Sequence, residues 1–164
     1  MLSAYRIAPI RPEDVDAVRD LQRATWASQS AKLPTTEKID GPGALTADPD
    51  DAETLLSHHL ILAWTRDTNI LHGSAGWFSD PKDRKCAYIR KVMVHPDAAG
   101  IRLGRALVLR VEALARRNGK TKFSVRAHGR AERFYQNLGY RTVARDAVNI
   151  GQIELTVLTM EKSA

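Results

Sequence analysis

The sequence lacks the features that mark secreted or membrane-spanning chains. Its only cysteine is Cys86, so no disulfide framework can form, which favours a reducing compartment. Its longest strongly apolar run, residues 60–64, is far shorter than the roughly 20 residues that cross a bilayer. The first residues turn charged before an apolar stretch of signal-peptide length develops. We therefore expect a soluble, cytoplasmic protein. Residues 1–164 should form one domain whose core needs neither disulfides nor metals to hold it.

A metal motif is also missing. The candidate ligands His58, His59, His72 and Cys86 do not have the spacing of a zinc site. We therefore expect no bound metal.

Acidic residues are scarce in the second half of the chain. Residues 90–145 carry fourteen Lys and Arg against three acids, whereas residues 1–89 carry ten basic and thirteen acidic side chains. A basic region of this kind indicates either an anionic ligand or a solvated helix surface. Nucleic acid would also suit the charge, but no recognition motif supports it, and we expect neither a nucleic-acid nor a membrane partner.

The hydrophobic patterns of the first half predict a strand, a helix and a hairpin. Residues 5–10 read as a strand, and Pro12 opens a helix that buries Val15, Val18, Leu21 and Thr25 and ends near residue 26. Residues 27–51, rich in Gly and Pro, predict a long loop around a short helix, with a second helical turn at 52–57. Strands follow at 60–65, 70–78 and 85–95.

The second half predicts alternating helices and strands. Residues 103–118 have helical spacing and end before Gly119, which suits a C-terminal cap. A strand at 122–127, a short helix at 130–138 closed by Gly139, and strands at 140–145 and 152–160 complete the pattern. The sequence therefore predicts an α/β fold with a mixed sheet.

The segment of residues 92–107 carries the first chemical signal. A strand ends, a loop of small residues follows, and a helix begins with its unpaired amides facing that loop. Such a helix start binds anions, because N–H groups and the positive end of the dipole converge there. Gly100 and Gly104 allow a phosphate to approach the backbone, and Arg102 and Arg105 add charge. By itself the pattern fits a phosphate loop or ordinary strand-loop-helix architecture.

Residues 128–140 hold a second motif, in which fixed spacings separate Ala131, the pair Phe134-Tyr135, Gly139 and Tyr140. Together the two segments resemble the GNAT superfamily of acetyl-CoA-dependent N-acetyltransferases. Residues 94–104 are similar to the family signature V-x-P followed by Q/R-x-x-G-x-G/A, and residues 131–140 to A-x-x-F-Y-x-x-x-G-F/Y. The opening I-R-P-E-D at residues 10–14 is also similar to the usual family start. The resemblance implies a mixed, mostly antiparallel sheet of six or seven strands flanked by about four helices.

The resemblance also implies how acetyl-CoA would be held as co-substrate. The strand at 85–95 would splay from its neighbour at a bulge, and the pantetheine arm would pair there with the backbone of Val92, Met93 and Val94. One of these amides would polarise the thioester carbonyl. The pyrophosphate would sit on the amides of Ala99, Gly100, Ile101, Arg102, Leu103, Gly104 and Arg105. His128 stands where the family often has a cofactor contact, and it either donates a hydrogen bond or lies on the surface.

The loop departs from the family pattern at two positions. Ala99 stands where Gln or Arg is usual, and Arg102 where the first Gly is usual. Either Arg102 is strained in a conformation that suits glycine, or Gly100 makes the turn and Arg102 replaces the charge missing at 99. We prefer the second account.

Tyr135 matches the family's general acid, which protonates the departing CoA thiolate. A phenol of pKa about 10 can donate to a thiolate whose conjugate acid lies near 8.5–10. The alternative is a core aromatic beside Phe134. The general base has no clear candidate: the family's usual Glu aligns with Tyr88, and a relay through Tyr88, His95 or Asp80 remains open.

We expect the chain to transfer the acetyl group of acetyl-CoA to a primary amine of a small molecule, by direct attack through a tetrahedral intermediate. Residues 37–53 hold six acids against Lys38 alone, in a region that often shapes the acceptor pocket in this family. This indicates either a cationic amine or a solvated acidic loop. The alternatives are a peptide or protein amine acceptor, and an acyl-CoA-binding domain with weak catalysis. The oligomeric state stays open, a homodimer included.

Overall fold

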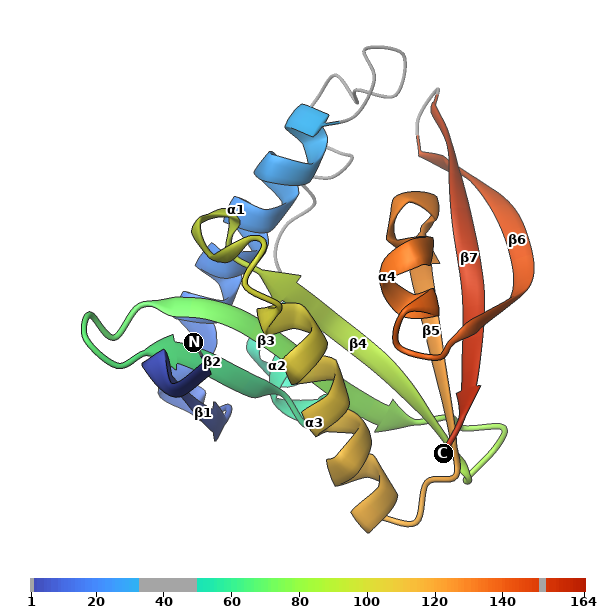
Figure 1. Cartoon of the computed structure of the whole chain (residues 1–164), viewed down its shortest axis with the longest axis horizontal. Coiled ribbons are helices and arrows are strands. Elements are labelled where there is room, and N and C mark those ends of the chain that lie inside the picture. The colour runs from blue at the N-terminus through green and yellow to red at the C-terminus, as the bar shows by residue number, and fades with distance from the viewer. Residues whose placement is uncertain (1, 33–49, 151–152) are drawn as a thin grey trace.

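One seven-stranded sheet, in the order β1-β2-β3-β4-β5-β7-β6, organises the protein (Figure 1). It is seen in a computed structural model that describes residues 2–32, 50–150 and 153–164. Only β4 and β5 run parallel; the other neighbours are antiparallel. The predicted mixed, mostly antiparallel sheet is thereby confirmed. The strands are β1 (Tyr5–Pro9), β2 (Ile61–Thr65), β3 (Leu71–Ser79), β4 (Cys86–Val94), β5 (Lys122–His128), β6 (Arg141–Ile150) and β7 (Ile153–Ser163).

Helices cover both faces of the sheet. Figure 1 shows α3 in front of it and α2 behind it. Leu107 and Val111 of α3 are fully buried in a core cluster with Phe123 of β5, whereas Val18 of α1 and Leu55 of α2 belong to a second cluster. The α-helices are α1 (Val15–Lys32), α2 (Ala52–Ser57), α3 (Leu103–Arg117) and α4 (Glu132–Gln136), and 3₁₀ turns lie at η1 (Leu2–Ala4), η2 (Pro12–Asp14), η3 (Pro96–Ala98) and η4 (Gly129–Ala131).

The first helix corrects the predicted loop at 27–51. Val15, Val18, Leu21 and Thr25 are buried as predicted, but α1 continues to Lys32. Residues 27–32 contain neither Gly nor Pro, so nothing in them ends a helix. The short helix expected within this loop falls on residues 33–49, outside the described part of the chain, whereas the predicted turn at 52–57 is α2.

The remaining predicted elements are present with shifted ends. Gly119 and Gly139 close α3 and α4 with φ angles of 81° and 96°, in the left-handed region that glycine adopts at least cost. The helix predicted at 130–138 is a 3₁₀ turn, η4, followed by the shorter α4. The last two strands extend beyond the predicted 145 and 160, to Ile150 and Ser163.

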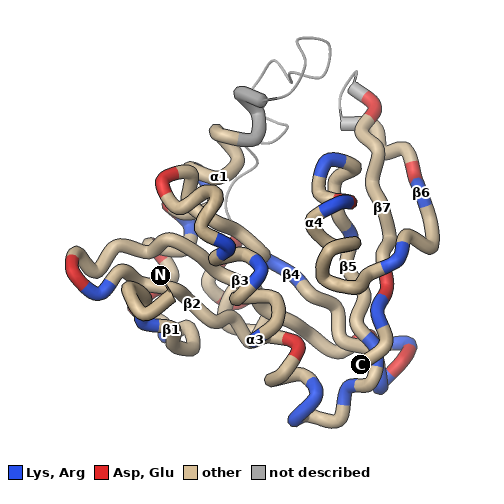
Figure 2. Tube along the Cα trace, viewed as in Figure 1, with Lys and Arg blue, Asp and Glu red and all other residues tan. Residues whose placement is uncertain are grey.

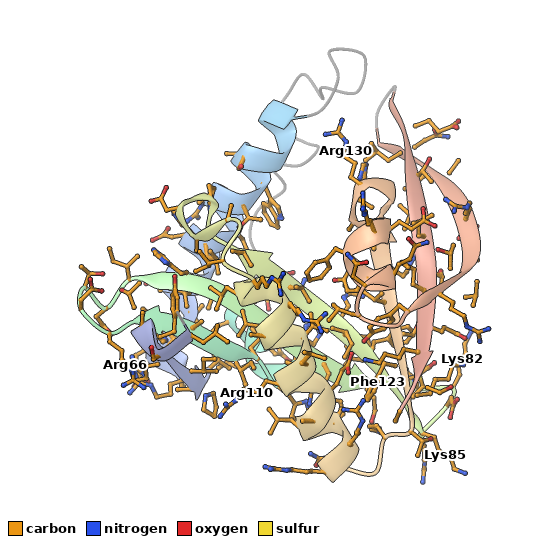
Figure 3. All side chains as sticks on the ribbon, in the orientation of Figure 1. Arg66, Lys82, Lys85, Arg110, Phe123 and Arg130 are labelled. Carbon is orange, nitrogen blue, oxygen red and sulfur yellow. The ribbon has the colours of Figure 1, made fainter. Side chains whose placement is uncertain are left out.

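The basic residues do not form one stripe. Figure 2 shows Lys and Arg spread over α3, α4, β4 and β6. Figure 3 likewise shows the labelled cations, Arg66, Lys82, Lys85, Arg110 and Arg130, at separate places around the molecule. No helix among the described residues has both the length and the apolar composition needed to cross a membrane.

Candidate active site

The parallel strands β4 and β5 pair over three residues and then separate. The pairs are Cys86 with Lys122, Ala87 with Phe123, and Tyr88 with Ser124. Beyond them β5 still pairs with β7 as far as His128, and β4 with β3 as far as Val94. Figure 1 shows the two strands diverging from their common end. We call the space between their unpaired edges the wedge.

A bulge in β4 lies beside the wedge. The register with β3 shifts between Ser74 and Gly76, and Lys91 takes a positive φ of 56°. The Ser74 hydroxyl donates a 2.7 Å hydrogen bond to the Lys91 carbonyl, which holds the bulge in place. Because a bulge bends its strand, the backbone after Lys91 is redirected along the wedge. This is the stretch, Val92 to Val94, in which the resemblance implied pantetheine contacts.

The loop after β4 presents a row of free amides. Among the described residues, the amides from Gly100 to Arg105 donate to no backbone carbonyl, and the first bond of α3 runs from the Ala106 amide to the Arg102 carbonyl. The Ala99 amide, in contrast, already donates to the Pro96 carbonyl at 3.2 Å. Six consecutive N–H groups without a backbone acceptor at a helix start are an arrangement that can bind an anion.

Two positive φ angles shape this loop, 82° at Gly100 and 62° at Arg102. The turn at Gly100 agrees with the preferred interpretation of the sequence. Arg102, however, also occupies the left-handed region, so the account of a strained position that suits glycine holds as well. The two explanations are not exclusive.

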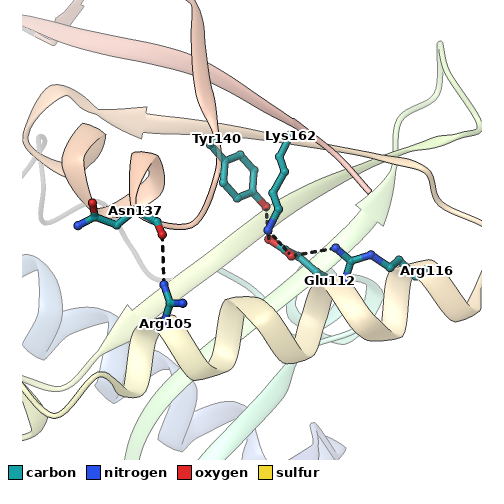
Figure 4. Close-up of polar contacts among 6 residues, drawn as sticks. All are labelled: Arg105, Glu112, Arg116, Asn137, Tyr140 and Lys162. Atoms are coloured by element: carbon teal, nitrogen blue, oxygen red, sulfur yellow. Dashed lines mark hydrogen bonds and ion pairs between the residues drawn. The ribbon is translucent and has the colours of Figure 1, made fainter.

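A cleft of about 750 Å³ opens over these amides. It lies between the loop, the start of α3, α1 and α4. Across it, Arg105 Nη1 donates to the Asn137 carbonyl at 3.2 Å, which ties α3 to the end of α4 (Figure 4). Its lining residues are Thr25, Ser28, Val94, Pro96, Ala98, Ala99, Gly100, Arg102, Leu103, Gly104, Arg105, Phe134, Asn137 and Leu138.

Gly104 permits close packing of α3 against its neighbours. A Cβ atom at this position would lie 3.2 Å from Val94 Cγ2 and 3.5 Å from Phe134 Cζ. The glycine therefore lets α3 approach β4 and α4 directly.

A second cavity of about 220 Å³ contains the predicted general acid. Tyr135 is only 6% exposed, and its ring packs edge-on against Phe134 (4.9 Å between centroids) and Tyr140 (5.5 Å). Burial raises the pKa of Tyr135 above its usual value, so the phenol stays protonated near neutrality. The cavity is lined by Gln22, Thr25, Trp26, Ile89, Arg90, Lys91, Val92, Met93, Val125, Arg126 and Tyr135.

Ten of the twelve predicted site residues line one of these two cavities. Val92, Met93 and Tyr135 line the smaller cavity, and seven others line the cleft. Ile101 instead packs against the core that α3 covers. His128 lines neither cavity; its Nδ1 accepts the Arg130 amide at 3.2 Å and caps η4.

A polar cluster beside the bulge was missed by sequence reasoning. Lys91 Nζ lies 2.6 Å from Asp50 Oδ2, which also accepts a 2.6 Å hydrogen bond from Gln22 Nε2. Burial disfavours the charge on Asp50, but hydrogen bonds from Lys91 and Gln22 outweigh it and hold its pKa below the ordinary value. The only sequence signal was Gln22 on the apolar face of α1, where it is 1% exposed.

The acidic segment at 37–53 is described only in part. Asp50 pairs with Lys91, and Asp51 caps α2 by accepting the Thr54 amide at 2.8 Å. The acids at 37, 40 and 48 lie outside the described residues. Asp50 and Asp51 thus have structural partners, and whether the other acids face an acceptor stays a prediction.

None of the three relay candidates lines the smaller cavity. Burial, then nearby Asp80, raises the pKa of Tyr88. His95 accepts the Asp97 amide and stacks on His72, with ring centroids 5.4 Å apart. No carboxylate of the described residues lines this cavity, and they contain no cluster of three or more His, Cys, Asp or Glu placed to hold a metal.

The wedge, the loop of free amides and the buried tyrosine define an acyl-CoA-dependent transferase of the GNAT type. Residues 16–140 match the model of the acetyltransferase (GNAT) family. Because this match covers most of the chain, the protein belongs to that family and is an acetyltransferase.

Solved structures share the fold. A GCN5-related N-acetyltransferase from Rhodopseudomonas palustris superposes with a TM-score of 0.79 at 24% identity, over 100% of this chain and 98% of that one. YncA of Salmonella typhimurium, described as a putative acetyltransferase with its cofactor acetyl-CoA, gives 0.70 at 18%, over 98% and 94%. The PaiA N-acetyltransferase of Thermoplasma acidophilum, in complex with coenzyme A, gives 0.72 at 16%, over 98% and 99%. No curated protein matched the sequence.

Proposed function

We propose that the protein transfers the acetyl group of acetyl-CoA to a primary amine of a small molecule. The observation that carries this proposal is the wedge between β4 and β5, with a row of free amides at one end and buried Tyr135 at the other. The acetyl-CoA and coenzyme A complexes of the Salmonella and Thermoplasma proteins support the choice of co-substrate.

Coenzyme A suits the groups that line the cleft. Its pyrophosphate is an anion, which the free amides from Gly100 to Arg105 and the side chains of Arg102 and Arg105 can bind. Its pantetheine arm is an extended chain with two amides, which can pair with the unpaired edges of β4 and β5. In this arrangement the thioester reaches the smaller cavity, beside Val92 and Tyr135.

Acetyl transfer in this arrangement needs a hydrogen-bond donor for the thioester oxygen, a proton donor for the leaving thiolate and an acceptor for the proton of the amine. A β4 amide between Val92 and Val94 donates to the thioester oxygen and stabilises the oxyanion that forms when the neutral amine attacks the carbonyl carbon. When the tetrahedral intermediate collapses, the C–S bond breaks and Tyr135 donates its proton to the thiolate. The ammonium must first lose its proton, and no carboxylate of the described residues lines the cavity to accept it.

The volume of the smaller cavity favours a small acceptor over a peptide or protein amine. At about 220 Å³ it has room for an acetyl group and a compact amine. The absence of a lining carboxylate among the described residues favours a second candidate, an acyl-CoA-binding domain with weak catalysis.

An acceptor screen distinguishes these candidates. Purified protein, acetyl-CoA and a panel of small primary amines and peptides are assayed for release of CoA thiol, and the N-acetyl product is identified by mass spectrometry. We expect small amines to raise the rate of thiol release above the rate measured without amine. Tight acetyl-CoA binding without amine-dependent release would instead support the binding domain, and faster release with peptides would support a peptide acceptor.

A further inference from the structure

Two arginines lie just beyond the point where β4 and β5 separate. The last parallel pair is Tyr88 with Ser124, and Arg90 and Arg126 each follow two residues later on their own strand. Side chains alternate along a strand, and the intervening Ile89 and Val125 are buried in the core under α3. Arg90 and Arg126 therefore emerge on the opposite face of the sheet. Both line the smaller cavity with Tyr135.

No acidic partner neutralises these two side chains within the described residues. Lys91, the third cation of the cavity, is paired with Asp50 at 2.6 Å, but neither Arg90 nor Arg126 forms a salt bridge in the described part of the chain. The Arg90 guanidinium instead lies 5.7 Å from the centre of the Phe78 ring. Two cations without an acidic partner at one cavity favour the binding of an anion there.

The charge of Arg90 also acts on a nearby histidine, His58. Burial lowers the pKa of His58, and the charges of Lys91 and Arg90 lower it further, while Asp50 acts in the opposite direction. Figure 2 shows the basic stretch of β4 beside the region where this strand leaves β5.

These arginines are separate from those that suit the cofactor phosphates. Arg102 and Arg105 line the larger cleft, whereas Arg90 and Arg126 line only the smaller cavity. The anion they attract therefore lies near the reacting thioester and belongs to the acceptor.

We infer that the acceptor amine carries a carboxylate, which Arg90 and Arg126 bind while the amine points toward the thioester. This inference rests on the proposed function. A guanidinium binds a carboxylate through two parallel N–H donors, and arginines on both sides of the wedge would fix the acceptor in one orientation. The substrate class is that of amino acids and similar amino carboxylates, rather than simple alkylamines or diamines.

Amines that differ only in the carboxylate test this inference. The thiol-release assay compares norleucine with pentylamine and phenylalanine with phenethylamine, each amine being its acid without the carboxylate. Cadaverine is pentylamine with a second cation at the far end of its chain. We expect kcat/KM for each acid to exceed that of its amine by roughly 10-fold or more, as for one charge-assisted contact.

Variants of Arg90 and Arg126 test whether these residues cause the preference for amino carboxylates. In Arg126→Gln and Arg90→Gln, kcat/KM should fall roughly 10-fold for the acids, while the amines and the KM for acetyl-CoA stay within about threefold. Arg126→Glu should shift the preference toward cadaverine. The control is Arg110→Gln, because Arg110 is exposed on α3 and lines neither cavity (Figure 3).

The results of the thiol-release assays test the inference separately from the proposed function. An acid preference that Arg126→Gln abolishes supports the inference. Thiol release that is equal for acids and amines, or fastest with cadaverine, would overturn the inference and leave the proposed function standing. An acid preference that both Gln variants retain would also overturn the assignment to these arginines. Absence of thiol release with every amine would remove the proposed function and the inference with it.

Discussion

Arg102 holds a backbone conformation that glycine adopts at lower cost, with a φ of 62° at the start of α3. Arg102→Gly should raise the free energy of unfolding by about 1 kcal/mol, whereas Arg102→Ala keeps the left-handed strain. Both variants should weaken acetyl-CoA binding by roughly 1–3 kcal/mol if the guanidinium meets a phosphate. Urea denaturation measures the stability and calorimetric titration the affinity. Unchanged affinity in Arg102→Ala would show that the side chain does not contact the cofactor and that only the strain distinguishes this position.

Tyr135 differs from phenylalanine by one oxygen, so Tyr135→Phe should preserve the packing against Phe134 and Tyr140. If the phenol protonates the leaving thiolate, kcat should fall roughly 10²–10⁴-fold with little change in acetyl-CoA affinity. Because burial raises the pKa of Tyr135, the wild-type rate should not decline through the ordinary phenol range near pH 10.0. A rate loss below about threefold would contradict the role as general acid, and an equal loss of cofactor affinity would make the hydroxyl a binding group.

At the scale of elements, a buried carboxylate joins α3 to the C-terminal strands (Figure 4). Glu112 is fully buried, lies 2.9 Å from Lys162 Nζ of β7, and accepts a 2.9 Å hydrogen bond from the Tyr140 hydroxyl. Arg116 approaches it at 3.3 Å. Since the Tyr140 ring packs against Tyr135, this cluster also supports the proposed general acid.

Glu112→Ala should therefore destabilise the fold by roughly 3–5 kcal/mol, because it leaves Lys162 poorly solvated without its counter-charge. The matched control is Lys122→Ala, which breaks a half-exposed pair with Glu161 at 3.2 Å and should cost about 0–1 kcal/mol. Chemical denaturation of both variants measures the difference. Equal losses would mean that the buried cluster adds no more than a surface pair.

Local patterns in the sequence determined most elements, and pairing between elements determined the rest. The apolar spacing of residues 103–118 and the following Gly119 were enough to predict α3. A motif of side-chain types singled out Tyr135, whose role as general acid stays a prediction. The family resemblance implied a bulge in this strand, but its position at Lys91 could not be predicted, since it is a register shift against β3 and no local residue type requires it. The meeting of Arg90 and Arg126 at one cavity likewise depends on how β4 and β5 lie beside each other. The length of α1 was underestimated because Pro and Gly further along were taken to end it.

For the whole molecule, acetyl-CoA should raise the melting temperature. A ligand that binds only the folded state stabilises it by RT ln(1 + [L]/Kd), which is about 2.7 kcal/mol at a hundredfold excess over Kd. Desulfo-CoA should act nearly as well, because the proposed contacts are to pantetheine and pyrophosphate. Differential scanning fluorimetry measures both shifts. No shift at millimolar cofactor would contradict the proposed function.

The folded state should lose stability in strongly alkaline solution. Burial raises the pKa of Tyr135, and burial together with Glu112 raises that of Tyr140, above the ordinary 10.0. Above that pH the unfolded chain releases phenolic protons that the folded chain retains, so unfolding is favoured as pH rises, by up to roughly 1.4 kcal/mol per pH unit for each phenol. Below it neither state ionises and the contribution is constant. The decline between about pH 10 and about pH 11 should be shallower in Tyr135→Phe, as measured by urea denaturation.

The separation of β4 from β5 also bears on self-association. Unpaired strand edges ordinarily invite pairing with another copy of the same chain, and proteins protect them with charges, bulges or coverings. Here two such edges lie within one sheet and face each other, beside a bulge and between Arg90 and Arg126. A strand of another folded copy would have to enter between these two edges together with the sheet to which it belongs. A single extended molecule, in contrast, occupies only the width of one strand. The same geometry that leaves these edges free for the proposed pantetheine contacts should therefore hinder pairing with a neighbouring sheet.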